Sequence, residues 1–137
     1  MSTPTRWFGY LFRIDQHWGM FAPAVFIDDG WFILEGTTKT GEQFDLNRQG
    51  RPITYAKPPN IVKLFKNDRW RKYSENYLFV DNSWMRAYYC NYWLRIWHQN
   101  PENPSLASLK VVYMKEISLP NYQVSPATRE VLCDCKP

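Results

Sequence analysis

Few residues of this chain combine the type and the spacing that acid–base or metal chemistry requires. His17 and His98 are far apart in the sequence, and we interpret both as structural, His98 because a cation is favourable at the end of an expected helix. Asp28 and Asp29 are adjacent in an expected turn, where acidic side chains are usually solvated or cap the backbone. A metal ion there would need further oxygen ligands from distant residues. No phosphate-binding glycine loop, metalloprotease helix or nucleophile elbow is present. We therefore predict no catalytic residue, no metal site and no cofactor.

The cysteines also give little indication of a chemical function. An odd count excludes complete pairing within the chain, and the residues are Cys90, Cys133 and Cys135. Cys133 and Cys135 are too close for an unstrained disulfide with each other, and three thiolates are too few for a structural zinc site. We therefore expect free thiols in a reducing compartment, or a frayed C-terminal tail, instead of a metal or redox role.

One charged cluster combines cations with rings: Lys66, Arg69, Trp70, Arg71, Lys72 and Tyr73. On a helix, Arg69, Trp70 and Tyr73 fall on neighbouring turns and form a stacked surface. Three uses stay open: a solvated helix packed by Trp70, a grip on lipid phosphates or a partner's acidic groups, and nucleic-acid binding. Nucleic acid is the weakest of these, because the net charge is only +4 and a polyanion site needs more cations on one face. The sequence identifies no small-molecule ligand.

The N-terminal segment, residues 1–22, has an amphipathic pattern. Its apolar side chains recur at helical spacing over residues 4–18. Arg13 and Asp15 interrupt the apolar run, so it is no membrane span, and no signal peptide is evident. The helix either covers the core of its own domain or lies in a lipid headgroup layer with its rings inserted. In the second case the contacting residues are Trp7, Leu11, Ile14, Trp18 and Phe21.

Residues 23–137 are expected to form a single α+β domain. Strands at 31–35 and 43–46 flank a polar, glycine-bounded loop, which predicts a hairpin. The first strand is apolar on both faces apart from Glu35, so we expect it to be covered on both sides. A polar loop at 47–59, with a short extended piece at 53–55, leads to a helix from Asn60 to Tyr73. A second, aromatic helix starts near Asp81 or Asn82 and ends before Asn100-Pro101. Strands at 106–119 and 129–133 complete a small antiparallel sheet of three to four strands packed against two aromatic-rich helices, with the N-terminal amphipathic helix in addition.

Five short motifs follow one another along the chain: Trp18-Gly-Met-Phe-Ala-Pro23, Asp29-Gly-Trp31, Arg69-Trp-Arg-Lys-Tyr73, Tyr92-Trp-Leu-Arg-Ile-Trp97 and Leu119-Pro-Asn-Tyr122. Over roughly residues 15–133, this order resembles the soluble tail that follows the membrane helices of HTTM-type bacterial proteins, which are related to the vitamin K-dependent carboxylase. Those membrane helices are missing here. The chain is then either an excised soluble domain or a stand-alone relative that reaches the membrane through residues 4–21. The resemblance carries over no catalytic residue.

These features predict a non-catalytic, membrane-peripheral domain or an accessory subunit of an integral-membrane protein. The residues that contact the membrane or partner are the five apolar anchors of the N-terminal segment together with Arg69, Trp70, Arg71 and Lys72. A second hypothesis is a subunit that docks on a membrane protein complex through the aromatic helix at 82–97. The third is an enzyme, which requires a cleft that brings Asp28 and Asp29 together with a histidine or an arginine. Free cysteines and the lack of a signal peptide favour the cytoplasmic side of the membrane.

Overall fold

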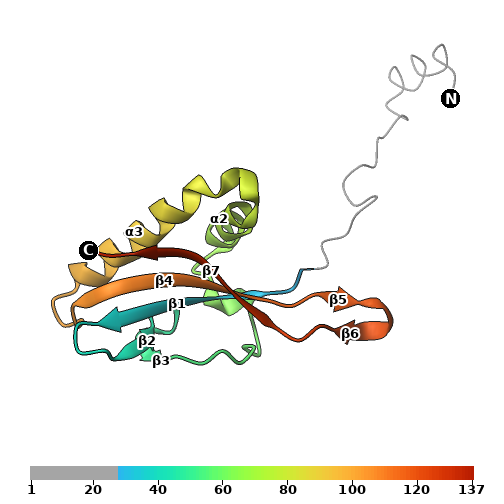
Figure 1. Cartoon of the computed structure of the whole chain (residues 1–137), viewed down its shortest axis with the longest axis horizontal. Coiled ribbons are helices and arrows are strands. Elements are labelled where there is room, and N and C mark those ends of the chain that lie inside the picture. The colour runs from blue at the N-terminus through green and yellow to red at the C-terminus, as the bar shows by residue number, and fades with distance from the viewer. Residues whose placement is uncertain (1–27) are drawn as a thin grey trace, which may run out of the picture.

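Two helices cover one face of an antiparallel sheet in the described part of the chain, residues 28–137 of a computed structural model (Figure 1). The 5-stranded sheet has the order β3-β2-β1-β4-β7. Its strands are β1 (Trp31–Thr38), β2 (Gln43–Asp45), β3 (Arg51–Pro52), β4 (Leu106–Lys115) and β7 (Thr128–Cys135). The helices are α2 (Asp68–Leu78) and α3 (Trp84–Gln99), and a separate hairpin consists of β5 (Ser118–Leu119) and β6 (Gln123–Val124). Short 3-10 turns occur at Leu46–Arg48, Val62–Leu64, Val80–Asn82 and Pro120–Tyr122.

The α+β class and the two helices are confirmed, whereas the expected strand number of three to four is wrong. The fifth strand is β3, where Arg51 pairs with Asp45 and Pro52 with Phe44. It precedes the extended piece expected at 53–55, and two residues are too few to show a strand periodicity. The expected N-terminal helix lies outside the described residues, as does the whole 1–22 segment.

Strand β1 is buried on both faces, as its sequence predicts. On the helix side, Phe32 and Leu34 join a core that also contains Phe44, Leu46, Tyr77, Tyr89, Leu94, Leu106, Leu109, Val111 and Tyr113. On the other side, Trp31 and Ile33 pack with Val112, Met114, Ile53, Ile61 and Leu64. The connection between β3 and α2 therefore covers the second face of the sheet.

The expectation of one helix from Asn60 to Tyr73 is wrong. Asn60 accepts a hydrogen bond from the Lys63 backbone N–H at 3.2 Å, but the turn that it caps ends at Leu64. Ile61 and Leu64 pack on the second face of the sheet, whereas Phe65 packs on the helix side. The chain must change faces between Leu64 and Phe65, so one continuous helix cannot satisfy both contacts. A new helix, α2, begins after Asn67, whose side-chain oxygen accepts from the Trp70 N–H at 3.1 Å.

The other boundaries lie near their predicted positions. Helix α3 begins at Trp84, close to Asp81 and Asn82, and ends before Asn100. The expected strand at 106–119 divides: its ladder with β1 and β7 ends at Lys115, and residues 118–119 pair instead with residues 123–124. At the division, the buried Glu116 carboxylate bonds to the Lys57 ammonium.

The expectation of three free thiols is wrong. Cys90 in α3 and Cys135 in β7 form a disulfide with their Cα atoms 6.2 Å apart, and Cys133 is free. The bond holds the C-terminal strand beside α3 (Figure 1). Because disulfides persist mainly in oxidising compartments, the thiol argument for a cytoplasmic location no longer holds. Within the part of the chain that the structure describes, no helix has both the length and the apolar character needed to cross a membrane.

Candidate functional site

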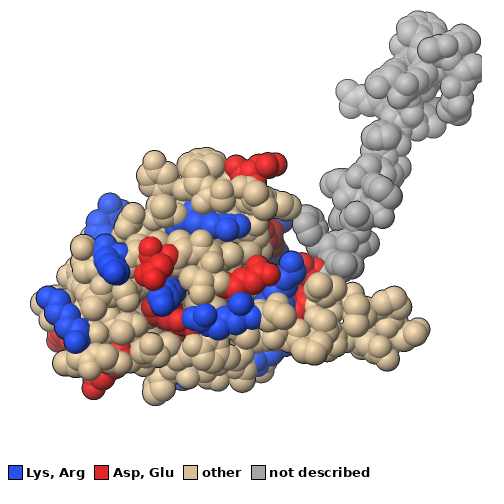
Figure 2. All heavy atoms as spheres, in the orientation of Figure 1, with Lys and Arg blue, Asp and Glu red and all other residues tan. Residues whose placement is uncertain are grey.

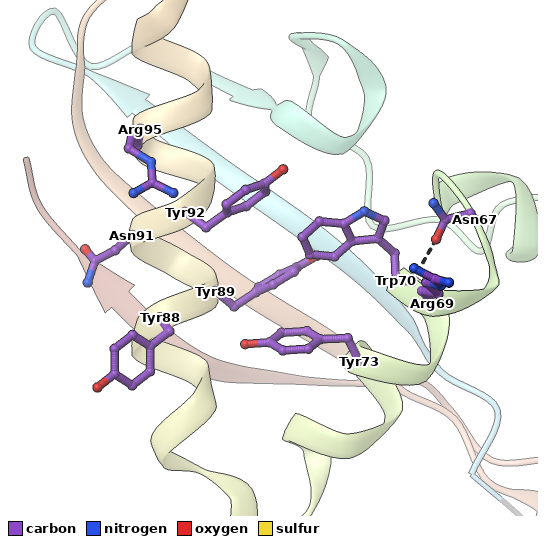
Figure 3. A pocket seen from close by; sticks show the side chains of 9 residues that line it. All are labelled: Asn67, Arg69, Trp70, Tyr73, Tyr88, Tyr89, Asn91, Tyr92 and Arg95. Atoms are coloured by element: carbon purple, nitrogen blue, oxygen red, sulfur yellow. Dashed lines mark hydrogen bonds between the residues drawn. The ribbon is translucent and has the colours of Figure 1, made fainter.

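The first candidate site is a cleft between the two helices, with a floor of aromatic rings (Figure 3). Trp70 and Tyr73 project from successive turns of α2, and Tyr89 and Tyr92 do so from α3, since residues three apart share a helix face. The ring centroids of Trp70 and Tyr92 are 5.0 Å apart, and those of Tyr73 and Tyr89 are 5.7 Å apart. The rings therefore pack across the helix–helix boundary. We call this site the aromatic cleft.

The rim of the aromatic cleft is polar and carries positive charge. The cleft has a volume of about 700 Å³. The residues of its rim are Asn67, Arg69, Tyr88, Asn91 and Arg95. No acidic residue is among the described residues that line it. Arg69 and Arg95 are both exposed. The Arg95 guanidinium carbon lies 5.9 Å from the centroid of the Tyr92 ring. The cleft thus places two guanidinium groups beside an apolar, ring-lined floor.

Two tyrosines of the floor, Tyr73 and Tyr89, contribute no negative charge. Burial raises the pKa of the Tyr73 and Tyr89 hydroxyls above the ordinary tyrosine value. The Tyr73 hydroxyl donates to the Met85 carbonyl at 3.4 Å, which links the two helices. At neutral pH these hydroxyls stay protonated, so the arginines determine the charge of the cleft.

Arg71 and Lys72 lie away from the aromatic cleft, although the sequence groups them with Arg69 and Trp70. They line a second cavity of about 710 Å³. Arg71 pairs with Asp68 at 3.1 Å and with Glu75 at 2.9 Å, and Lys72 pairs with Glu75 at 3.1 Å. The structure therefore brings Arg69 and Trp70 together and separates them from the other two cations. The five predicted anchors Trp7, Leu11, Ile14, Trp18 and Phe21 lie outside the described residues.

Asp28 and Asp29 line the second cavity together with Arg71, which is the combination that the enzyme hypothesis requires. Their carboxylates, however, have internal partners. Asp28 accepts from the Tyr113 hydroxyl at 2.5 Å, and Asp29 pairs with the Lys57 ammonium at 3.0 Å. Burial, followed by the bond to Asp28, raises the pKa of Tyr113. This arrangement closes the junction between β1 and β4 and leaves the acids engaged in structural contacts.

Of the two histidines, His98 makes a structural contact, and His17 lies outside the described residues. The Nε2 atom of His98 accepts from the Leu106 backbone N–H at 3.2 Å, which joins the end of α3 to the start of β4. Across residues 28–137 there is no cluster of three or more histidine, cysteine or acidic side chains that fits a metal ion.

The second candidate site is the β5–β6 hairpin, residues 117–127, which extends beyond the sheet (Figure 1). These residues include no lysine, arginine, aspartate or glutamate. On the face seen in the space-filling view the hairpin carries no charge, and charged side chains lie next to its base (Figure 2). Leu119 is 44% exposed, Val124 is 56% exposed and Tyr122 is fully exposed. We call this element the uncharged arm.

The tip of the uncharged arm has an unusual backbone. Asn121 and Tyr122 have φ angles of 62° and 57°, both in the left-handed region. The loop between the paired residues Leu119 and Gln123 has three residues, and hairpin loops usually place glycine or asparagine where φ is positive. A tyrosine there is strained. The turn therefore holds the Tyr122 ring outward at a conformational cost.

Sequence reasoning missed the α3 half of the cleft and the arm. The spacing of Tyr88, Asn91, Tyr92 and Arg95 places them on one helical face, which was a usable signal. The arm had a signal as well: an uncharged stretch between Glu116 and Arg129.

Known protein families, curated proteins and solved structures were compared with this chain, and none of them matches it.

Proposed function

We propose that this protein is a non-catalytic, membrane-peripheral domain that turns its uncharged arm toward a bilayer. The observation that carries the proposal is the position of the base of the arm in the domain. Ile117, at its base, forms a β-bridge with Asp28, the residue at which the chain enters from the N-terminal segment. The predicted anchors in residues 1–22 and the arm are thus connected to the same end of the domain. The resemblance of the five sequence motifs to the tails of HTTM-type membrane proteins supports the same function.

The chemistry of the arm suits a lipid interface. Tyrosine has an apolar ring and a polar hydroxyl, and it is enriched at the level of lipid headgroups. Leu119 and Val124 flank it with exposed apolar side chains, and burying each large side chain contributes about 1.5–3 kcal/mol. The arm itself has no charge to desolvate.

Electrostatics is expected to add little at this end of the domain. Lys115 lies 3.8 Å from Asp28 and 4.0 Å from Glu130, and Arg129 bonds to Glu35 at 2.7 Å. Because these cations already have acidic partners, lipid phosphates gain little from them. Salt should therefore weaken membrane binding without abolishing it.

Liposome flotation tests the proposal with two matched substitutions. Val124→Asp places a charge on the arm, whereas Val131→Asp places one on β7, and the wild-type valines are similarly exposed at 56% and 47%. On vesicles of phosphatidylcholine and phosphatidylglycerol, we expect Val124→Asp to reduce binding about ten-fold or more and Val131→Asp to leave it nearly unchanged. Equal flotation of the two variants rejects the arm as a membrane surface. Unchanged flotation of a Trp7→Ser/Trp18→Ser double variant rejects the predicted N-terminal anchors.

A second candidate function is docking of α3 on a membrane protein complex. Trp84 and Tyr88 are 64% and 68% exposed and their ring centroids lie 6.0 Å apart, so the start of α3 presents an aromatic pair. Under this alternative, wild-type protein ignores protein-free vesicles but sediments with native membranes, and Trp84→Ser abolishes the sedimentation. Vesicle binding that survives Trp84→Ser favours the lipid surface instead.

A further inference from the structure

We propose that the aromatic cleft binds a small anion that carries a flat ring, such as an aryl phosphate or a nucleotide-like compound. This ligand site goes beyond membrane docking and does not depend on it. The cleft lies between α2 and α3, whereas the arm follows the end of β4. The inference rests on the unpaired cations, the ring-lined floor and the absence of acids from the described lining.

The two cleft arginines differ from most other arginines of the described chain. Elsewhere, Arg48, Arg71 and Arg129 pair with carboxylates, and Arg86 donates to the Tyr77 and Leu78 carbonyls. Within residues 28–137, the side chains of Arg69 and Arg95 have no carboxylate within 4.0 Å and make no hydrogen bond, and both residues are exposed. They come from different helices and lie at opposite ends of the row of rings, Arg95 beyond Tyr92 and Arg69 beyond Trp70 (Figure 3). A guanidinium group binds phosphate or carboxylate through paired N–H donors, so each arginine can hold an anion at its own end of the ring-lined floor.

Amide groups add uncharged donors to this rim. The Asn67 side-chain oxygen already accepts from the Trp70 N–H, which leaves its NH₂ group free to donate. Asn91 is exposed between Tyr88 and Tyr92. With no acid in the described lining, nothing there repels a negative group. The Asn67 amide lies beside Arg69 (Figure 3), so an anion at the Arg69 end of the cleft would meet a charged and an uncharged donor.

The floor explains why the anion should carry a ring. Trp70, Tyr73 and Tyr92 are only partly buried, although their neighbours Tyr77 and Tyr89 are buried at 0% and 6% exposure. The rings of Trp70 and Tyr92 are tilted by 36° with their centroids 5.0 Å apart, so they pack partly over each other while each keeps some apolar surface exposed. A flat ring stacks favourably on such a surface, while a bare inorganic anion gains nothing from it.

The dimensions favour a small molecule over a polymer. A cleft of about 700 Å³ is of the size that ordinary small-molecule ligands occupy. Two arginines are too few to follow a polyanion along its backbone, which needs a series of cations.

The test uses the full chain, labelled with ¹⁵N, and three probes: phenyl phosphate, inorganic phosphate and phenol. We expect phenyl phosphate to shift the indole N–H signal of Trp70 with a Kd of about 1–10 mM, a normal affinity for so small a ligand. The indole of Trp31, 2% exposed on the other face of the sheet, should not move. Each of the other two probes should bind at least about ten-fold more weakly. Equal binding of inorganic phosphate or of phenol, or no binding of phenyl phosphate, overturns the proposal.

Substitution of exposed arginines then locates the site without disturbing the fold. Arg69→Gln should weaken phenyl phosphate binding about ten-fold, since it removes the charged donor beside Asn67, and Arg95→Gln, at the other end of the cleft, should weaken it less. Arg51→Gln, at an exposed position on β3, is the matched control and should retain wild-type affinity. Equal affinity in all three variants overturns the assignment of the cleft.

Discussion

The disulfide between Cys90 and Cys135 should account for a large share of the stability of this domain. It closes a loop with a sequence separation of 45 residues. For a loop of that length, the chain-entropy relation gives a loss of about 13 cal/mol/K in the conformational entropy of the unfolded chain. Near room temperature this loss stabilises the folded state by about 4 kcal/mol. We therefore expect Cys135→Ala to lower the free energy of unfolding by about 3–4 kcal/mol. Cys90 is fully buried, so it is left in place to avoid a cavity.

Cys133 provides a matched control two residues away on the same strand. It is the free thiol, and it donates to the Arg86 carbonyl at 3.2 Å. Cys133→Ala should cost about 1 kcal/mol, the value of one such hydrogen bond. Guanidinium denaturation followed by far-UV circular dichroism measures both variants, and wild-type protein treated with a reductant should behave like Cys135→Ala. Because the bond constrains the unfolded chain, its loss should also increase the denaturant dependence, m.

Two results would refute this reasoning. Thiol titration of the unreduced, denatured wild-type protein should detect one reactive thiol per chain, and three would mean that the pairing is wrong. One thiol combined with equal destabilisation in the Cys135→Ala and Cys133→Ala variants would mean that the pairing is right but the loop-entropy argument is not.

Three further predictions concern residues that the disulfide does not involve. Among the described residues, Arg129→Ala leaves the buried Glu35 carboxylate with the Tyr55 hydroxyl as its one side-chain partner, so urea denaturation should show a loss of about 2–3 kcal/mol, against little change for Arg51→Ala. Burial raises the pKa of the Cys133 thiol to about 11; its alkylation by iodoacetamide in folded protein should rise with a midpoint near that pH, and a midpoint near the pKa of an ordinary thiol would contradict the burial. Tyr122→Gly relieves the backbone strain of the left-handed conformation at φ 57°. It should raise the free energy of unfolding by about 0.5–1 kcal/mol and lower vesicle binding. A destabilised variant would show that the strain is absent.

Local signals predicted most of the fold. The glycine-bounded loop after β1, the Asn100-Pro101 stop and the apolar run of β4 each encode their structure within a few residues. The misplaced helix had a tertiary cause, since Leu64 and Phe65 pack on opposite faces of the sheet and no local pattern reveals that the chain crosses between them.

The candidate sites depended even more on distant contacts. Arg69 and Trp70 stood out in the sequence, but Arg95 lines the same cleft only because α2 packs on α3. The choice between Cys133 and Cys135 as the partner of Cys90 depends on the register of β7 against β4, which contains a shift between Val111 and Val112. Spacing alone does not specify such a register.

The outer edges of the sheet have a consequence for how the protein behaves at high concentration. At one edge, β3 has two residues, and one of them, Pro52, has no N–H to offer another chain. At the other edge, β7 carries Arg129, Glu130 and Asp134, charges of the kind that discourage pairing with a foreign strand. Neither border is a good template for polymerisation. The domain should therefore resist amyloid-like stacking even when its chains are crowded together.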